Sequence, residues 1–287
     1  TNKRRSLLIT SIIFSKNRPL QLDLCLNSIY KNFPDSTNNI VIYYHSPEFE
    51  SAYKQLQNSH NNVDWWKQSG SIFKDILVAV GSSQHDYICF FTDDDIVYDV
   101  VPRIDEDLFN NPGVACVSLR MGMNIQKRKH LGSVFPDLPS EVIRATNDYI
   151  YWNRTKHPYG SYWSYSLSVD GHIFRKNNLW NMMEELCLLE QKYKWKQNPN
   201  ELEAAMQRFW AITPPLIVSP ENSVVVNSPN NRVSDSGEQN MSGEDFTFCE
   251  EDFLKDFLKG VTIDMELLDF KDISCPHTEI NLIKGLP

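Results

Sequence analysis

Several common catalytic signatures are absent from this sequence. It contains no GxGxxG, GxxxxGK[ST], HExxH or GxSxG segment. These absences argue against dinucleotide oxidoreductases, P-loop nucleoside triphosphatases, zincin metalloproteases and α/β-hydrolases. The six cysteines include no CxxC pair, so zinc-ribbon spacing is absent too. Several of them lie inside apolar runs, where a reduced buried thiol is the ordinary state, and we therefore expect a reducing compartment.

An excess of positive charge and a long apolar run are also lacking. Lys and Arg total 28 against 37 Asp and Glu, a formal net charge of -9. This balance argues against a nucleic-acid partner bound through its phosphates. The first apolar stretch, SLLITSIIF, is shorter than the roughly 20 residues that span a bilayer. We expect a cytoplasmic protein with no transmembrane segment in this chain, and peripheral attachment to a membrane is left open.

The first 120 residues alternate between two hydrophobic periods. Residues 6–15 are apolar and β-branched, as in a buried strand, and residues 20–33 place apolar side chains on one helical face. NNIVIYYHS, YICFFTD and GVACVSL are further predicted strands, and EFESAYKQLQ and SGSIFKDILVAVGSS are further predicted helices. Such alternation predicts an α/β, Rossmann-like fold, with a mostly parallel central sheet flanked by helices. Ligands of such sheets lie beyond the carboxyl ends of the strands.

The second half is less regular. Residues 177–195 and 198–212 are predicted helices, the latter with Asn198 as N-cap, Pro199 in the first turn and Glu201 at the capping-box position. Residues 227–244 are rich in Asn, Ser and Gly, which indicates a mobile loop that could act as a lid.

Three consecutive aspartates, Asp93, Asp94 and Asp95, follow the predicted strand YICFF. Adjacent carboxylates repel one another unless solvent, a cation or hydrogen-bond donors offset the repulsion. Asp93 and Asp95 are two residues apart and can point the same way in an extended segment. Two carboxylates at the open end of a strand indicate a Mg²⁺ or Mn²⁺ site, whose remaining ligands come from phosphate oxygens.

Two segments resemble glycosyltransferases of the GT-A fold, which use nucleotide-diphosphate sugars. SIIFSKNRPLQLDLCLNSI is similar to their first strand, loop and helix, and YICFFTDDDIVY is similar to their DXD segment. The resemblance covers residues 6–120 and becomes patchy beyond. It implies one catalytic domain over residues 1–287, with a nucleotide-binding half (1–120) and an acceptor-binding half (121–287).

The resemblance also implies site residues. Those expected to contact the nucleotide are Phe14, Ser15, Arg18, Ser46, Lys74, Asp93, Asp94 and Arg232. Those expected to hold Mn²⁺ or Mg²⁺ are Asp95, Asp93 and the C-terminal histidine His277. Those expected near the donor sugar or acceptor are Tyr162, Trp163 and His172.

Transfer with inversion requires a carboxylate that takes the proton of the acceptor hydroxyl. The family often places it at a helix start after an aromatic acceptor loop. Glu203 is preferred here, because Glu201 has a capping role. Asp170 is a further candidate, because it precedes Gly171 at a predicted strand start. The chain lacks a clean Glu-Asp pair in this region, which leaves the base and inversion itself open.

The sequence therefore predicts a metal-dependent, inverting glycosyltransferase. It would move a sugar from a nucleotide-diphosphate sugar, a UDP-sugar by default, to a glycan or glycolipid hydroxyl. A sugar-1-phosphate nucleotidyltransferase is one alternative, although IIFSKNRPLQL lacks the glycine-rich basic loop of that class. A non-catalytic glycan-binding relative is another.

Overall fold

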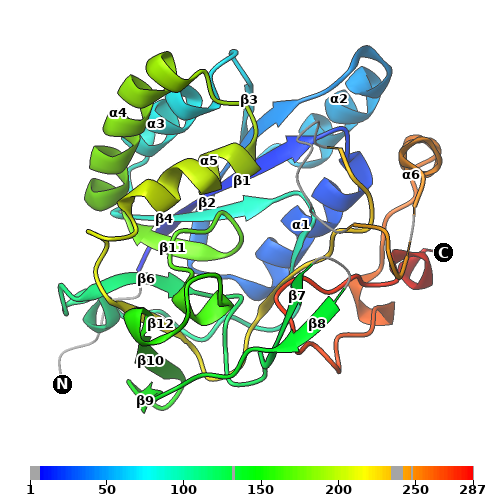
Figure 1. Cartoon of the computed structure of the whole chain (residues 1–287). Coiled ribbons are helices and arrows are strands. Elements are labelled where there is room, and N and C mark those ends of the chain that lie inside the picture. The colour runs from blue at the N-terminus through cyan, green and yellow to red at the C-terminus, as the bar shows by residue number, and fades with distance from the viewer. Residues whose placement is uncertain (1–6, 131–132, 234–241, 247, 287) are drawn as a thin grey trace, which may run out of the picture.

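The computed structural model describes residues 7–130, 133–233, 242–246 and 248–286. Within these ranges, nine strands form one sheet in the order β3-β2-β1-β4-β11-β6-β12-β10-β9 (Figure 1). The strands are β1 (Ile9–Lys16), β2 (Ser36–Tyr44), β3 (Val63–Lys67), β4 (Tyr87–Thr92), β6 (Val114–Ser118), β9 (Ile143–Arg144), β10 (Tyr149–Asn153), β11 (His172–Arg175) and β12 (Leu216–Pro220). Strands β1 to β4 are parallel, and β11 is antiparallel to both of its neighbours.

Two short ribbons and the helices complete the described secondary structure. One ribbon pairs β5 (Asp95–Val97) with β13 (Val225–Asn227), and the other pairs β7 (Lys127–His130) with β8 (Ser133–Pro136). The α-helices are α1 (Pro19–Asn32), α2 (Glu50–Ser59), α3 (Ile72–Ser82), α4 (Lys176–Tyr193), α5 (Pro199–Met206) and α6 (Glu250–Leu258). Short 3-10 helices cover Pro47–Phe49, Glu106–Phe109, Arg154–Lys156, Tyr162–Ser164, Gln207–Phe209, Met265–Leu267 and Leu282–Gly285.

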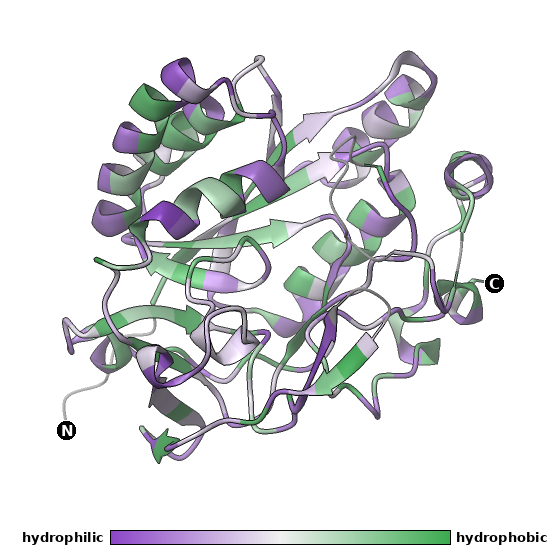
Figure 2. Cartoon of the chain, viewed as in Figure 1, coloured by the Kyte–Doolittle hydropathy of each residue, from purple (hydrophilic) through white to green (hydrophobic). Residues whose placement is uncertain are grey.

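Helices cover the sheet in two groups. Helices α1, α2 and α6 contact one another, and α3, α4 and α5 form the second group on the other side of the sheet (Figure 1). Figure 2 shows hydrophobic residues concentrated along the central strands and on the helix faces turned toward them. Ile12 and Ile13 of β1 and Phe90 of β4 are fully buried. The sheet and its two covering layers therefore form the hydrophobic core.

The predicted α/β class is confirmed by this mostly parallel sheet. Each strand and helix expected in residues 6–120 is present, and the structure adds β3 at the sheet edge. The helix expected over residues 198–212 ends at Met206 and continues only as a 3-10 turn. Asn198 caps it, as expected, by accepting a hydrogen bond from the backbone of Glu201.

The two halves of the chain share the sheet. Strand β11, from the second half, lies between β4 and β6 of the first half. Part of the loop predicted over residues 227–244 is described, while residues 234–241 lie outside the described ranges. Every helix within those ranges is too short or too polar to cross a bilayer.

Candidate functional site

The loop after β1 is fixed by Asn17. This residue adopts a left-handed conformation with φ 55°, which Asn tolerates better than most side chains. Its amide group exchanges two 2.9 Å hydrogen bonds with Ser46, at the end of the neighbouring strand β2. Helix α1 then begins at Pro19, a residue suited to the first helical turn. The loop therefore places Arg18 in a defined position beside the end of β4.

Arg18 neutralises two of the three aspartates. Its Nη1 atom lies 3.0 Å from Asp93 Oδ1 and 2.7 Å from Asp94 Oδ2. The backbone N–H of Lys16 donates to Asp93 Oδ2 at 2.9 Å. Burial raises the pKa of Asp93 to about 6, and the Arg18 charge opposes that rise. Arg18 thus offsets much of the repulsion between the two carboxylates.

Asp95 lies inside the protein rather than at the pocket surface. Its side chain is 0% exposed and accepts hydrogen bonds from the Thr92 backbone (2.8 Å) and from the Asn227 amide (3.0 Å). Burial first, then the charges of Asp170 and Asp94, raise its pKa well above the usual range. A raised pKa favours the neutral acid, and a neutral Asp95 adds less repulsion than a third buried carboxylate would.

Asn227, at the end of β13, links the aspartates to the C-terminal segment. Its amide group donates to Thr92 Oγ1, Asp94 Oδ1 and Asp95 Oδ1 within 3.1 Å. Its carbonyl oxygen accepts from His277 Nδ1 at 3.1 Å. The other imidazole nitrogen of His277, Nε2, therefore carries the lone pair and lies 3.5 Å from the guanidinium nitrogen Nη1 of Arg120. Burial and the Arg120 charge lower the pKa of His277 to about 4.

A second buried arginine, Arg120, organises the opposite end of the site. Its Nη1 atom lies 2.7 Å from Asp170 Oδ2, and its guanidinium group lies over the rings of Tyr162 and Tyr165. Asp170 precedes Gly171, where φ is 65° and an added Cβ would come within 3.1 Å of Val225. Glycine is needed there, and it allows the turn that directs Asp170 toward the end of β4.

Glu203, on the first turns of α5, lies beside this pair. Its Oε1 atom accepts a 3.3 Å hydrogen bond from the backbone of Val169. Burial and the negative charge of Asp170 raise its pKa to about 7, and Arg120 partly opposes them. The hydroxyl of Thr92 lies 2.8 Å from Asp94 and 3.3 Å from Asp170, and so connects the two ends of the site.

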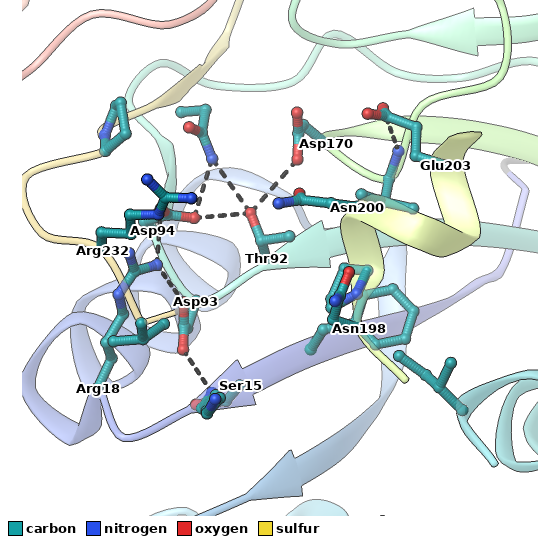
Figure 3. A pocket seen from close by; sticks show the side chains of 18 of the residues that line it. Ser15, Arg18, Thr92, Asp93, Asp94, Asp170, Asn198, Asn200, Glu203 and Arg232 are labelled. Atoms are coloured by element: carbon teal, nitrogen blue, oxygen red, sulfur yellow. Dashed lines mark hydrogen bonds and ion pairs between the residues drawn. The ribbon is translucent and has the colours of Figure 1, made fainter. Parts of the chain in front are cut away.

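Both clusters border one cavity of about 1060 Å³ at the carboxyl ends of β1, β2 and β4 (Figure 3). This volume is at the upper end of the usual range for ligand pockets. The strand order reverses between β1 and β4, the usual ligand position in an open α/β sheet. Of the residues proposed from sequence, those lining it are Phe14, Ser15, Arg18, Asp93, Asp94, Tyr162, Asp170, Glu203, Arg232 and His277.

Six of the proposed residues do not line the cavity. Ser46 supports the β1 loop, Lys74 is exposed on α3, and Asp95 is buried beneath the site. Trp163 and His172 are fully buried, and Glu201 lies on α5 outside the lining. Their proposed roles stay predictions.

Sequence reasoning missed four polar residues of the site. Arg120 follows β6 and Asn227 ends β13, and neither belongs to a recognisable motif. Tyr165 lies in an aromatic-rich segment in which lining and core residues alternate without a period. Thr92 directly precedes the aspartates, and this position is the sequence feature that could have identified it as a site residue.

The donor set fits a divalent cation. Arg18, itself a cation, is held by Asp93 and Asp94 together, so this pair binds positive charge in the structure. Among the described residues, no group of three or more His, Cys, Asp or Glu could hold a metal ion. Asp93 and Asp94 are two neighbouring carboxylates of the cavity lining, and Mg²⁺ is commonly bound by one or two carboxylates when substrate phosphates supply other ligands.

Neither the protein-family models nor the curated proteins include a match to this chain. Solved structures similar to it include Staphylococcus aureus TarS 1-349 in complex with UDP-GlcNAc, at 15% identity and TM-score 0.47 over 84% of this chain and 63% of that one. Another is the mannosyltransferase PcManGT from Pyrobaculum calidifontis in complex with GDP-Man and Mn²⁺, at 12% identity and TM-score 0.42, covering 81% and 59%. A longer TarS structure is similar at 17% identity and TM-score 0.43, covering 74% and 35%. The chain thus spans about a third to three fifths of those structures, and similarity at this level assigns no function.

Proposed function

We propose that this chain is a glycosyltransferase that moves a sugar from a nucleotide-diphosphate sugar to a glycan hydroxyl. The observation that carries this proposal is one cavity with two different ends. One end holds a charged cluster of Arg18, Asp93 and Asp94, and the other holds Glu203 beside Asp170. The first suits an anionic leaving group, and the second suits the removal of a proton.

The first end is assigned to the nucleotide diphosphate. Lys16, Arg18 and Arg232 line it and supply positive charge in a chain whose overall charge is negative. Asp93 and Asp94 would hold Mg²⁺ or Mn²⁺, which when bound offsets negative charge on the leaving diphosphate. A uridine nucleotide is the default donor.

The second end is assigned to the acceptor. Glu203 accepts the proton of the acceptor hydroxyl as its oxygen bonds to the anomeric carbon of the sugar. The bond from that carbon to the diphosphate breaks at the same time, and the nucleotide diphosphate leaves with the electron pair. A base works best when its pKa lies near the working pH, and burial raises that of Glu203 to about 7. Attack from the face opposite the leaving group inverts the anomeric centre.

The remaining roles follow from the same lining. Tyr162 and Tyr165 border the cavity beside Arg120 and would offer ring faces to a sugar. Arg120 keeps Asp170 paired, and among the residues that the structure describes Glu203 has no ion-pair partner. A carboxylate in this position favours a transferase over a non-catalytic glycan-binding relative.

Nucleotide binding is the direct test of this proposal. We would titrate the protein by calorimetry with UDP, GDP and dTDP, each with Mn²⁺ and again with EDTA. Binding of one nucleotide to the folded protein supports the assignment and identifies the donor class. Failure of all three to bind in either condition contradicts it and favours the glycan-binding alternative.

Two neighbouring variants sharpen the same titration. Asp94 lines the cavity, so Asp94→Asn should weaken nucleotide binding with Mn²⁺ roughly tenfold, the order of one charged interaction. Asp95→Asn should change affinity by less than about threefold, because Asp95 is buried outside the cavity lining and cannot touch the nucleotide there. A larger loss in Asp95→Asn would instead support Asp95 as the metal ligand that the sequence suggested.

A further inference from the structure

Arg18 occupies the position between the two aspartates that the proposed function gives to a divalent cation. A single guanidinium nitrogen, Nη1, contacts both carboxylates, at 3.0 Å and 2.7 Å. A cation coordinated by Asp93 and Asp94 would need the oxygens that this nitrogen uses. Arg18 and a metal ion therefore compete for the same two carboxylates.

The same guanidinium group has a second set of contacts on its other side. Its Nη2 atom donates to the backbone oxygen of Asn231, whose side chain accepts a 2.8 Å hydrogen bond from Gln21. Arg18 could thus give up the carboxylates and keep its link to Asn231. The Nη2 contact to Asn231 can persist while another cation takes over the Nη1 contacts to the two aspartates.

Two buried donors next to this contact have no acceptor. Arg18 and Asn231 are each 7% exposed, and neither Arg18 Nε nor Asn231 Nδ2 has a hydrogen-bond partner among the described residues. Both residues line the cavity. Buried donors without acceptors are costly, and an anion rich in oxygen atoms would satisfy them.

The charges indicate that replacement of the Arg18 guanidinium group by a divalent cation would favour the binding of a diphosphate as well as of the cation. Two carboxylates and one guanidinium carry a combined charge of -1, which repels a diphosphate. If a divalent cation replaces the guanidinium group, the two carboxylates and the metal sum to zero. Arg18 then retains a full positive charge that the aspartates no longer offset. The combined charge of the aspartates, Arg18 and the metal ion is then +1, compared with -1 for the aspartates and Arg18 alone, so the site attracts a diphosphate.

We propose that Arg18 and a divalent cation exchange places when the nucleotide diphosphate binds: the cation takes the Asp93 and Asp94 carboxylates, and Arg18 turns its guanidinium group to the diphosphate oxygens. This inference rests on the proposed function. It makes Arg18 a competitor of the metal ion and a ligand of the nucleotide. Removal of Arg18 should therefore affect the two ligands in opposite directions.

The test is a comparison of Arg18→Met with the wild-type chain. Mn²⁺ binding without nucleotide would be measured from the electron paramagnetic resonance signal of free Mn²⁺. Nucleotide binding would be measured by calorimetry with whichever of UDP, GDP or dTDP binds the wild type best. We expect Mn²⁺ to bind Arg18→Met at least about tenfold more tightly and the nucleotide to bind at least about tenfold more weakly, the usual range for coupled sites.

Arg144→Met is the matched control, because Arg144 pairs with Glu221 on the surface, outside the cavity lining. It should change neither affinity. If Arg18 were merely structural, its loss would weaken both ligands, and that result overturns the exchange. Arg18→Lys, which keeps the charge but only one donor centre, should lie between wild type and Arg18→Met for both ligands.

The wild-type chain gives an independent decision if Arg18→Met does not fold. Exchange requires Mn²⁺ and the nucleotide to strengthen each other's binding by the same factor, about tenfold. Equal nucleotide affinity in Mn²⁺ and in EDTA overturns the exchange but leaves the proposed function standing. Absence of nucleotide binding in every condition is the separate failure of the proposed function.

Discussion

Two buried arginines organise the two ends of the cavity, and they do so differently. Arg18 contacts both carboxylates of its pair, Asp93 and Asp94. Arg120 contacts Asp170 but makes no ion pair with Glu203. At one end both carboxylates are paired with an arginine, whereas at the other end Glu203 has no ion-pair partner among the described residues.

The same three influences set the pKa of one carboxylate at each end. Burial and the Asp94 charge raise the pKa of Asp93 to about 6, and the Arg18 charge opposes them. Burial and the Asp170 charge raise the pKa of Glu203 to about 7, and the Arg120 charge opposes them. The ends differ instead in contact, because Arg18 touches Asp93 whereas Arg120 touches Asp170 and not Glu203.

Glu203→Gln should have the largest effect of the changes considered, and it should act on the rate of sugar transfer. Glutamine keeps the shape and cannot take a proton, so we expect sugar transfer to fall roughly 10²- to 10⁴-fold, the usual contribution of a general base. Nucleotide affinity should stay within about twofold, because the change lies at the other end. Initial transfer rates and calorimetric titration would be compared. Near-normal transfer in Glu203→Gln, with a large loss in Glu201→Gln, would move the base to Glu201.

Arg120→Met should have the next largest effect, and on stability. It leaves the buried Asp170 carboxylate without its partner, which typically costs about 3–5 kcal/mol. Arg120→Lys should recover part of this loss, because it restores a positive charge. Urea unfolding of the three proteins measures the free energy of unfolding. A loss under about 1 kcal/mol in Arg120→Met would show that Asp170 does not depend on the arginine.

The sequence predicted most of the fold and part of the first end of the cavity, where Arg18, Asp93 and Asp94 lie in the lining but Ser46 and Asp95 do not. Hydrophobic periodicity and capping residues predicted the bounds of β1, α1 and β4 and the start of α5 to within a few residues, because these signals are local. The ribbon β7–β8 and strands β9 and β10 were missed. Their polar or mixed sequences carry little periodic signal, and their pairing depends on distant partners.

The second end of the cavity could be predicted only in part. Asp170 and Glu203 were candidates because each lies at the start of an element. Arg120, the partner of Asp170, was not a candidate, because the contact spans 50 residues and no local sequence pattern indicates it. The competition of Arg18 for Asp93 and Asp94 was also hidden, since sequence gives residue types and not which groups touch.

The smallest predicted effect is a slope of stability with pH. The folded pKa of Glu203 is about 7 against 4.5 for the free group, and that of Asp93 is about 6 against 3.8. At a pH between the unfolded and folded pKa values of a group, the folded state binds more protons than the unfolded state. The contribution of these two groups to the free energy of unfolding is therefore largest at low pH and is lost as the pH rises through 6 and 7. We expect the free energy of unfolding, measured in EDTA without nucleotide, to fall on the order of 1–3 kcal/mol from pH 5.5 to pH 8.

Glu203→Gln should flatten the upper part of this slope and Glu201→Gln should not. A stability that rises over this pH range would mean that neither carboxylate is disfavoured by folding, and the contrast between the two ends of the cavity would then have no electrostatic basis.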